Sequence, residues 1–186
     1  MHVVRVIQAL WVILIGWWII RAFDNKRAKI RQGRGSRLAY LAGALAVVYG
    51  LKSCRGLNFL LLPVNAVTQA AGILICAAGV AVAIWARQTL GRNWSGFVVI
   101  KQDHELIQGG PYQYVRHPIY TGLILAFTGT FLALVPTTRY FLLELVLVIA
   151  FYIKARHEER ILAREFGGEY TAYRQRVRGA LIPFVL

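Results

Sequence analysis

The chain has 186 residues, of which 58% are apolar, and a mean hydropathy of +0.52. Soluble domains contain about 45–50% apolar residues, whereas here apolar runs recur that are long enough to cross a hydrocarbon layer of about 30 Å. The composition therefore predicts a membrane protein and argues against a soluble enzyme of the doubly wound α/β type.

The charge is strongly basic, with 22 Lys and Arg against 8 Asp and Glu. In a soluble protein this balance would suggest nucleic-acid binding. Here the basic residues gather between apolar runs, as they do on the cytoplasmic face of membrane proteins, so we expect no nucleic-acid partner. The two cysteines, Cys54 and Cys76, lie far apart in apolar surroundings and are expected to be buried thiols.

The first half of the chain predicts three membrane helices. Residues 3–23 form an apolar run of about 20 residues, which is long enough to span. A basic flank follows this run and no cleavage site does, which favours a retained helix over a signal peptide. Residues 38–51 form the shortest predicted span, and residues 66–86 the third. The third is rich in Ala and Gly, which allow helices in lipid to pack closely.

The second half predicts two further spans, residues 118–135 and 140–153. A tight turn at 136–139 joins them, so we expect an antiparallel hairpin. A polar helix, 154–166, extends the last span and ends at a Gly-Gly pair. Glu144 lies near the outer end of the last span. A buried acid in lipid is usually functional, but its distance from the other candidate residues favours a packing or interfacial role with a hydrogen bond to a neighbour.

The distribution of basic residues predicts the topology. Five spans place eighteen Lys and Arg on one side of the membrane and four on the other. The positive-inside rule then places the N-terminus outside, and the long loop at 87–117 and the C-terminal tail in the cytoplasm. The predicted fold class is thus an all-α polytopic membrane protein with about five transmembrane helices.

The first candidate site lies where the fourth span begins. Pro118 suits the first position of a helix, where its missing N–H is not needed. We expect the N–H groups of Ile119, Tyr120 and Thr121 to remain open to a carboxylate or phosphate, with His117 beside them. The alternative is a capped helix at the membrane interface with no ligand.

The second candidate is the acidic pair Glu158 and Glu159, in the most basic part of the chain. The pair has a purely structural interpretation, charge balance with Lys154 and Arg156 at helical spacing. Its functional interpretation is to hold a cationic amine at the membrane surface. The segment is not a zinc-protease motif, because that motif needs a second histidine where the chain has Ile161, and no metal is expected.

The third candidate is the loop segment from His104 to Tyr112. Gly109 and Gly110 would let the backbone approach a ligand closely, although a Gly-Pro step also occurs in plain turns.

Together these segments resemble the isoprenylcysteine carboxyl methyltransferases and their prokaryotic relatives. The resemblance covers residues 90–186, about half of the chain, and rests on several motifs in the same order. They are LGRNWS at 90–95, HxLI at 104–107, GPY at 110–112, RHPxYxG at 116–122, and EExxLxxxFGxxYxxY at 158–173.

The resemblance implies an integral membrane enzyme that uses S-adenosylmethionine, with N-terminal transmembrane helices in 1–86 and a catalytic region in 87–186. The cofactor pocket would lie on the cytoplasmic side, formed by loop 87–117 and the C-terminal tail. In that family a substrate-facing arginine stands where this chain has Lys154, so Lys154, Arg156 and Glu159 are the candidate catalytic residues. The residues that would line the cofactor are His104, Glu105, Leu106, Ile107, Tyr112, His117, Pro118, Ile119, Tyr120 and Glu158.

The expected reaction is methyl transfer to the carboxylate of a lipophilic, isoprenylcysteine-like acceptor that enters from the bilayer. Phospholipid N-methyltransferases share the Glu-Glu arrangement, so an amine acceptor is the first alternative. An NADPH-dependent enzyme similar to sterol reductases and a non-catalytic adaptor that binds anionic lipid are the others. An enzyme of the expected kind requires His117 and Glu158 to meet at one hollow.

Overall fold

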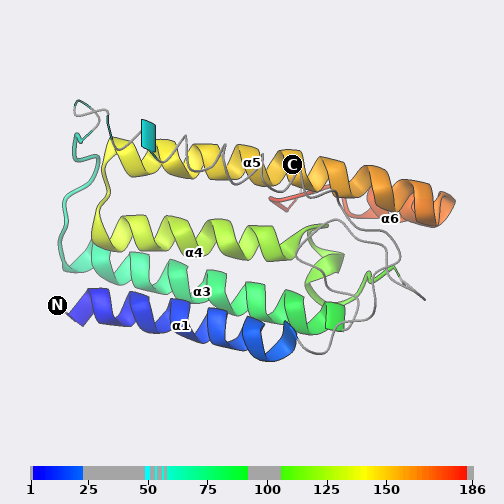
Figure 1. The fold of residues 1–186 in the computed structure, drawn as a ribbon, viewed down its shortest axis with the longest axis horizontal. Coiled ribbons are helices and arrows are strands. Elements are labelled where there is room, and N and C mark those ends of the chain that lie inside the picture. Colours follow the sequence, from blue (N-terminus) through cyan, green and yellow to red (C-terminus); the bar gives the residue numbers. More distant parts are fainter. Residues whose placement is uncertain are drawn as a thin grey trace.

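The computed structural model describes residues 2–22, 49–50, 53, 56, 58–91 and 106–183. Within these residues the protein is helical, with loops and one isolated β-bridge (Figure 1). The elements are α1 (His2–Ala22), α3 (Ala66–Leu90), the 3₁₀-helix η2 (Gly110–Gln113), α4 (Pro118–Leu134), α5 (Thr138–Phe166) and α6 (Gly168–Arg176).

The four long helices lie side by side in the order α1, α3, α4, α5 (Figure 1). Helices α1 and α3 run in the same direction, α4 runs against α3, and α5 runs against α4. The hairpin predicted for the last two spans is therefore confirmed. Its second helix continues through the polar segment to Phe166 and ends at Gly167, whose φ of 52° suits a glycine. The predicted second span, 38–51, lies outside the described residues apart from residues 49–50.

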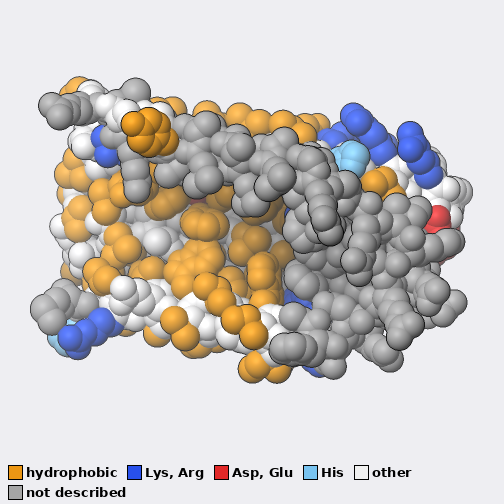
Figure 2. Space-filling model, viewed as in Figure 1, with side chains coloured by type: hydrophobic (Ala, Val, Ile, Leu, Met, Phe, Trp, Pro, Cys, Tyr) orange, Lys and Arg blue, Asp and Glu red, His pale blue; other side chains and the backbone are white. Residues whose placement is uncertain are grey.

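Two helices among the described residues are long and apolar enough to cross a membrane, His2–Arg21 and Ala66–Leu90; Pro118–Leu134 is apolar but shorter. Large apolar side chains point outwards from the bundle, as in Val12 and Leu74, which are 68% and 69% exposed. Figure 2 shows hydrophobic side chains along the bundle. A surface of this kind is suited to lipid rather than water.

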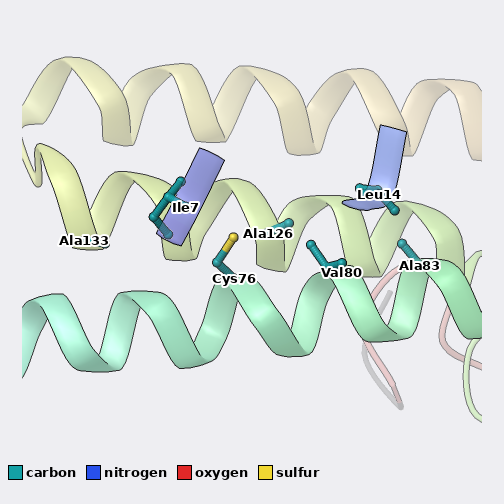
Figure 3. Packing of buried hydrophobic residues seen from close by; sticks show 7 residues of the cluster. All are labelled: Ile7, Leu14, Cys76, Val80, Ala83, Ala126 and Ala133. Atoms are coloured by element: carbon teal, nitrogen blue, oxygen red, sulfur yellow. The ribbon is translucent and has the colours of Figure 1, made fainter. Parts of the chain in front are cut away.

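Small residues allow the backbones of α3 and α4 to lie in direct contact. A methyl group on Gly79 would lie 2.4 Å from the backbone nitrogen of Ala126, and one on Gly122 would lie 2.6 Å from that of Ala83. Ile7 and Leu14 of α1 cover this seam and complete the core (Figure 3). The close packing that the Ala and Gly content predicted is therefore confirmed, and it fixes the start of α4 beside the end of α3.

The end of the bundle away from α6 is closed by local polar contacts. Asn65 caps α3 by accepting hydrogen bonds from the N–H groups of Val67 and Thr68.

Within the bundle, the Thr128 hydroxyl of α4 donates a hydrogen bond to the Glu144 carboxylate of α5, at 2.7 Å. The expected hydrogen bond of Glu144 to a neighbouring side chain is thus confirmed.

We expect Gly129→Ala to lower the free energy of unfolding by about 1–3 kcal/mol, because the added methyl would lie 2.3 Å from the Cys76 backbone nitrogen and would force the two helices apart. The matched control is Gly16→Ala in α1, whose added methyl has no atom within 4 Å. The control should change stability by no more than about 1 kcal/mol. Unfolding by SDS in mixed micelles, followed by circular dichroism, measures both variants. Equal effects would contradict the packing described above.

Candidate active site

The site lies at the end of the bundle where α3 ends, α4 begins and α5 extends beyond its neighbours (Figure 1). His117 is the residue before α4, and Pro118 occupies the first helical position, as predicted. The N–H groups of Tyr120 and Thr121 donate to the His117 carbonyl oxygen at 3.0 and 3.2 Å. The prediction that these two groups are open to a ligand is therefore wrong, because the first turn of the helix closes on its own cap residue.

His117, Tyr120 and Glu158 form one polar cluster. The Tyr120 hydroxyl donates to Glu158 Oε1 at 2.6 Å, and His117 Nδ1 lies 3.5 Å from Glu158 Oε2. His117 Nε2 lies 3.5 Å from Glu159 Oε1, so the imidazole sits between the two acids. The start of α4 and the acidic pair of α5 thus meet directly, which is the geometry that the sequence argument required.

Aromatic rings continue this cluster towards the apolar part of α5. The rings of His117 and Tyr120 stack with centroids 5.5 Å apart, and those of Tyr120 and Phe151 stack at 4.9 Å. Lys154 places its ammonium 5.2 Å from the centre of the Tyr120 ring. A cation, a carboxylate and an aromatic face therefore lie together at the boundary between the apolar and polar halves of α5.

The charges of this cluster depend on one another. Burial alone would raise the pKa of Glu158, but the hydrogen bond and charge of His117, with help from Lys154 and Tyr120, outweigh burial and lower that pKa. Burial alone would lower the pKa of His117, but its contacts with Glu158 and Glu159 raise it. Glu158 is therefore a carboxylate at neutral pH, and His117 is shifted towards its protonated form.

Several other residues predicted to line a cofactor gather beside the cluster. Tyr112, in η2, is buried against Ile119, with Ile107 and Tyr120 packed on the same group. The Tyr173 hydroxyl donates to the Tyr112 carbonyl oxygen at 2.7 Å and so fixes η2 to α6. Leu106 packs instead with the tyrosines of α6. His104 and Glu105 lie outside the described residues.

Arg116 forms a buried ion pair that was not predicted from the sequence. Its side chain is 5% exposed, and its Nε lies 2.7 Å from Glu159 Oε1. Its Nη1 donates to the carbonyl oxygens of Val177 and Arg178 at 2.6 and 2.5 Å. Arg116 thereby joins α4, α5 and the C-terminal segment. The sequence feature that could have indicated this ion pair is the acidic pair in the extension of α5, because an acid that is buried there needs a cationic partner.

The three candidate catalytic residues do not converge on one point. Lys154 shares a face of α5 with Glu158 and faces Tyr120. Arg156 lies 3.4 Å from Glu159 Oε2, on the face that packs near α6. Burial would raise the pKa of Glu159, but its contacts with His117 and Arg116 lower it to about 2. Glu159 is thus committed to an ion pair, whereas Lys154 borders the His117–Tyr120–Glu158 cluster.

Comparison with known proteins identifies the family of this chain. Residues 71–164 match the isoprenylcysteine carboxyl methyltransferase (ICMT) family, and the matched segment contains α4 and the acidic pair of α5. The chain belongs to this family. The family resemblance noted from the motifs is therefore confirmed, with the match extending over residues 71–164.

Individual relatives of this ICMT-family chain include both oxygen and sulfur methyltransferases. It is 32% identical over 99 residues to protein-S-isoprenylcysteine O-methyltransferase B of Arabidopsis thaliana, covering 52% of this chain and 50% of that protein. It is 44% identical over 73 residues to methanethiol S-methyltransferase 1 of Bradyrhizobium diazoefficiens, covering 39% and 24%.

A solved structure of the eukaryotic intramembrane Ras methyltransferase ICMT has a similar fold, with a TM-score of 0.59 and 25% identity. That alignment covers 84% of this chain and 55% of the solved chain. The chain spans about half the length, or less, of these relatives.

Proposed function

We propose that this protein is an integral membrane methyltransferase that transfers the methyl group of S-adenosylmethionine to the carboxylate of a lipophilic, isoprenylcysteine-like acceptor. The observation that carries the proposal is the His117–Tyr120–Glu158 cluster at the polar end of an apolar helical bundle. Membership of the ICMT family supports the same reaction class.

The residues present fit the functional groups of S-adenosylmethionine, which are an ammonium, a carboxylate and a sulfonium. Glu158 is a largely buried carboxylate that can hold the ammonium, and His117 lies beside it and keeps it ionised. Ile107 and Tyr112, which pack beside Tyr120, offer an apolar wall. We assign the same role of lining the cofactor to His104, Glu105 and Leu106, by the family resemblance alone.

The chain's own contribution to the reaction is alignment and exclusion of water. Bound S-adenosylmethionine supplies an electrophilic methyl group, and the acceptor supplies its own nucleophile, so no side chain needs to act as one. Lys154 can hold the acceptor carboxylate beside the Tyr120 ring, because its ammonium already lies there. Glu159 acts as a positioning residue, since its ion pair with Arg116 orients the start of α4.

We infer the topology from the same placement. The cofactor is soluble in water, so the cluster belongs at the cytoplasmic face, with the N-terminal end of α1 at the outer face. The basic residues of α5 and α6 lie at the cluster's end of the bundle, consistent with the positive-inside rule (Figure 2).

A small thiol is the second candidate acceptor, because the relative with 44% identity is named a methanethiol S-methyltransferase. An amine headgroup is the alternative that the acidic pair suggested. The three acceptors give chemically different products: an ester, a thioether and a methylated amine.

The test is methyl transfer by the full chain in phosphatidylcholine nanodiscs, with S-adenosylmethionine labelled in its methyl group. The acceptors are a farnesylated cysteine derivative, methanethiol and phosphatidylethanolamine. We expect label in the farnesylated compound that is released as methanol by alkali, as only an ester allows. Label confined to the thiol or the amine would overturn the carboxylate assignment. Absence of transfer to all three, together with no binding of S-adenosylhomocysteine, would overturn the enzyme class.

A further inference from the structure

A second polar site lies between α5 and α6; it adjoins the His117–Tyr120–Glu158 cluster through Glu159, which borders both. It is a cavity of about 160 Å³ bordered by the guanidinium-bearing residues Arg156, Arg160 and Arg174, together with Glu159 and Tyr170. We call it the arginine pocket. Arg160 and Arg174 are exposed to solvent and Arg156 is 42% exposed, so the positive charges surround an opening.

Tyr170, which lines the arginine pocket, carries a buried hydroxyl without a hydrogen-bond partner among the described residues. The residue is only 2% exposed. A buried polar group without a partner is costly, and such groups need an explanation. Burial, reinforced by the Glu159 carboxylate, raises the pKa of Tyr170, so the hydroxyl keeps its proton and can donate it to an anion.

The arginine pocket is positive in spite of its single acid. Glu159 Oε1 pairs with Arg116 at 2.7 Å, and Oε2 lies 3.4 Å from Arg156. The Glu159 charge is thus compensated by a buried arginine outside the pocket. Guanidinium groups and a hydroxyl donor form the environment that a phosphate group prefers.

A large apolar groove lies on the same face of α5. It has a volume of about 800 Å³ and is lined by α3, η2 and the residues after it, α4, α5 and the C-terminal segment, with Trp85, Thr121, Ile149, Tyr152 and Ile182 among its walls. We call it the apolar groove. Its Tyr152 is one helical turn from Arg156, about 6 Å along the axis, which is the distance that a glycerol unit can bridge.

The two features share residues with the proposed active site, Pro118 in the groove and Arg156 and Glu159 in the pocket, but they lie on a different face of α5 from Tyr120. Phe151, Lys154 and Glu158 follow one another at helical spacing on the face of α5 that meets Tyr120. The walls of the apolar groove and of the arginine pocket occupy a different face of the helix. An occupant of both would therefore lie on the other side of α5 from Glu158 and Lys154.

We propose that the arginine pocket and the apolar groove together bind one anionic glycerophospholipid. Its phosphate lies among Arg160, Arg174 and the Tyr170 hydroxyl, and an acyl chain lies in the groove. A lipid is favoured over a soluble phosphate because the phosphate-binding and chain-binding features continue along one face of one helix, from its polar extension into its apolar half.

The experiment measures retention of dioleoyl phosphatidic acid relative to dioleoyl phosphatidylcholine by the full chain in mixed micelles, using native mass spectrometry. We expect a preference of about tenfold or more for phosphatidic acid, in view of the number of arginines. The double variant Arg160→Gln/Arg174→Gln should reduce this preference to about twofold or less, and Tyr170→Phe should lower it several-fold without loss of ring packing. The matched control, Arg164→Gln/Arg178→Gln, removes the same charge outside the pocket and should keep the preference.

The acyl-chain half of the proposal is tested with Ile149→Trp, which places a bulkier side chain in the wall of the apolar groove. This variant should weaken retention of phosphatidic acid while leaving the affinity for inorganic phosphate unchanged. If inorganic phosphate binds at the pocket and Ile149→Trp has no effect on lipid, the site takes a soluble phosphate and the lipid assignment is overturned. If the pocket variant and the control variant reduce the preference for phosphatidic acid to the same extent, the positive charge acts non-specifically and the proposed site is overturned. Circular dichroism confirms the helical content of each variant.

Discussion

Replacing Glu158 by Gln should lower the affinity for S-adenosylhomocysteine by roughly 10- to 100-fold, because losing a hydrogen bond to a charged group costs about 1.5–3 kcal/mol. The Glu158 carboxylate accepts a hydrogen bond from the Tyr120 hydroxyl at 2.6 Å and lies 3.5 Å from His117 Nδ1. Glutamine keeps the size of the side chain and removes its charge, so a bound ammonium would lose its counter-ion. Isothermal titration in detergent micelles measures the change.

The control for this prediction is Glu165→Gln, seven residues farther along the same helix. Glu165 is exposed, and its substitution removes the same charge outside the cluster. We expect its affinity to stay within about twofold of the original protein, since exposed charges contribute little. An unchanged dissociation constant for Glu158→Gln, in a protein with normal helical content, would contradict the assigned role of Glu158.

The sequence predicted the elements whose signals are local. The α4–α5 hairpin followed from two apolar runs and the turn between them, and the end of α5 followed from its Gly-Gly pair. The packing of α3 on α4 followed from Ala and Gly, because small residues are what close helix contact in lipid requires. The motif order also brought His117 and Glu158 to the same site.

Features that depend on the path of side chains in space were not predictable. Spacing alone indicated that Glu159 could pair with Arg156, but its shorter contact is with Arg116, 43 residues earlier in the chain. That partner depends on how α4 and α5 meet. Similarly, the first turn of α4 was expected to offer free N–H groups, but the His117 carbonyl oxygen occupies two of them. Glu158 and Glu159 therefore have different partners and different roles, although they are adjacent in sequence, because neighbours on a helix point about 100° apart.

The separation of those roles leads to a prediction about stability. Replacing Glu159 by Gln should lower the free energy of unfolding by about 3–5 kcal/mol, the usual cost of leaving a buried charge without its partner. Arg116 is 5% exposed and would lose its only acidic contact among the described residues. Reversible unfolding by SDS, followed by circular dichroism, measures this loss. A change below about 1 kcal/mol would be typical of an exposed pair and would contradict the burial described for this one.

The same ion pair should make the protein sensitive to acid. The pKa of Glu159 is lowered in the folded protein from its ordinary value of 4.5 to about 2. The ion pair therefore stabilises the fold fully above pH 4.5, and this contribution is lost as the pH falls towards about 2. Glu159→Gln should remove this part of the acid sensitivity.

Arg116→Met should also loosen the C-terminal segment, because Arg116 donates hydrogen bonds to the carbonyl oxygens of Val177 and Arg178. Limited trypsin digestion should cleave at Arg178 faster in Arg116→Met than in Glu159→Gln, which keeps these two hydrogen bonds. Equal cleavage rates would show that the C-terminal segment is held by contacts other than Arg116.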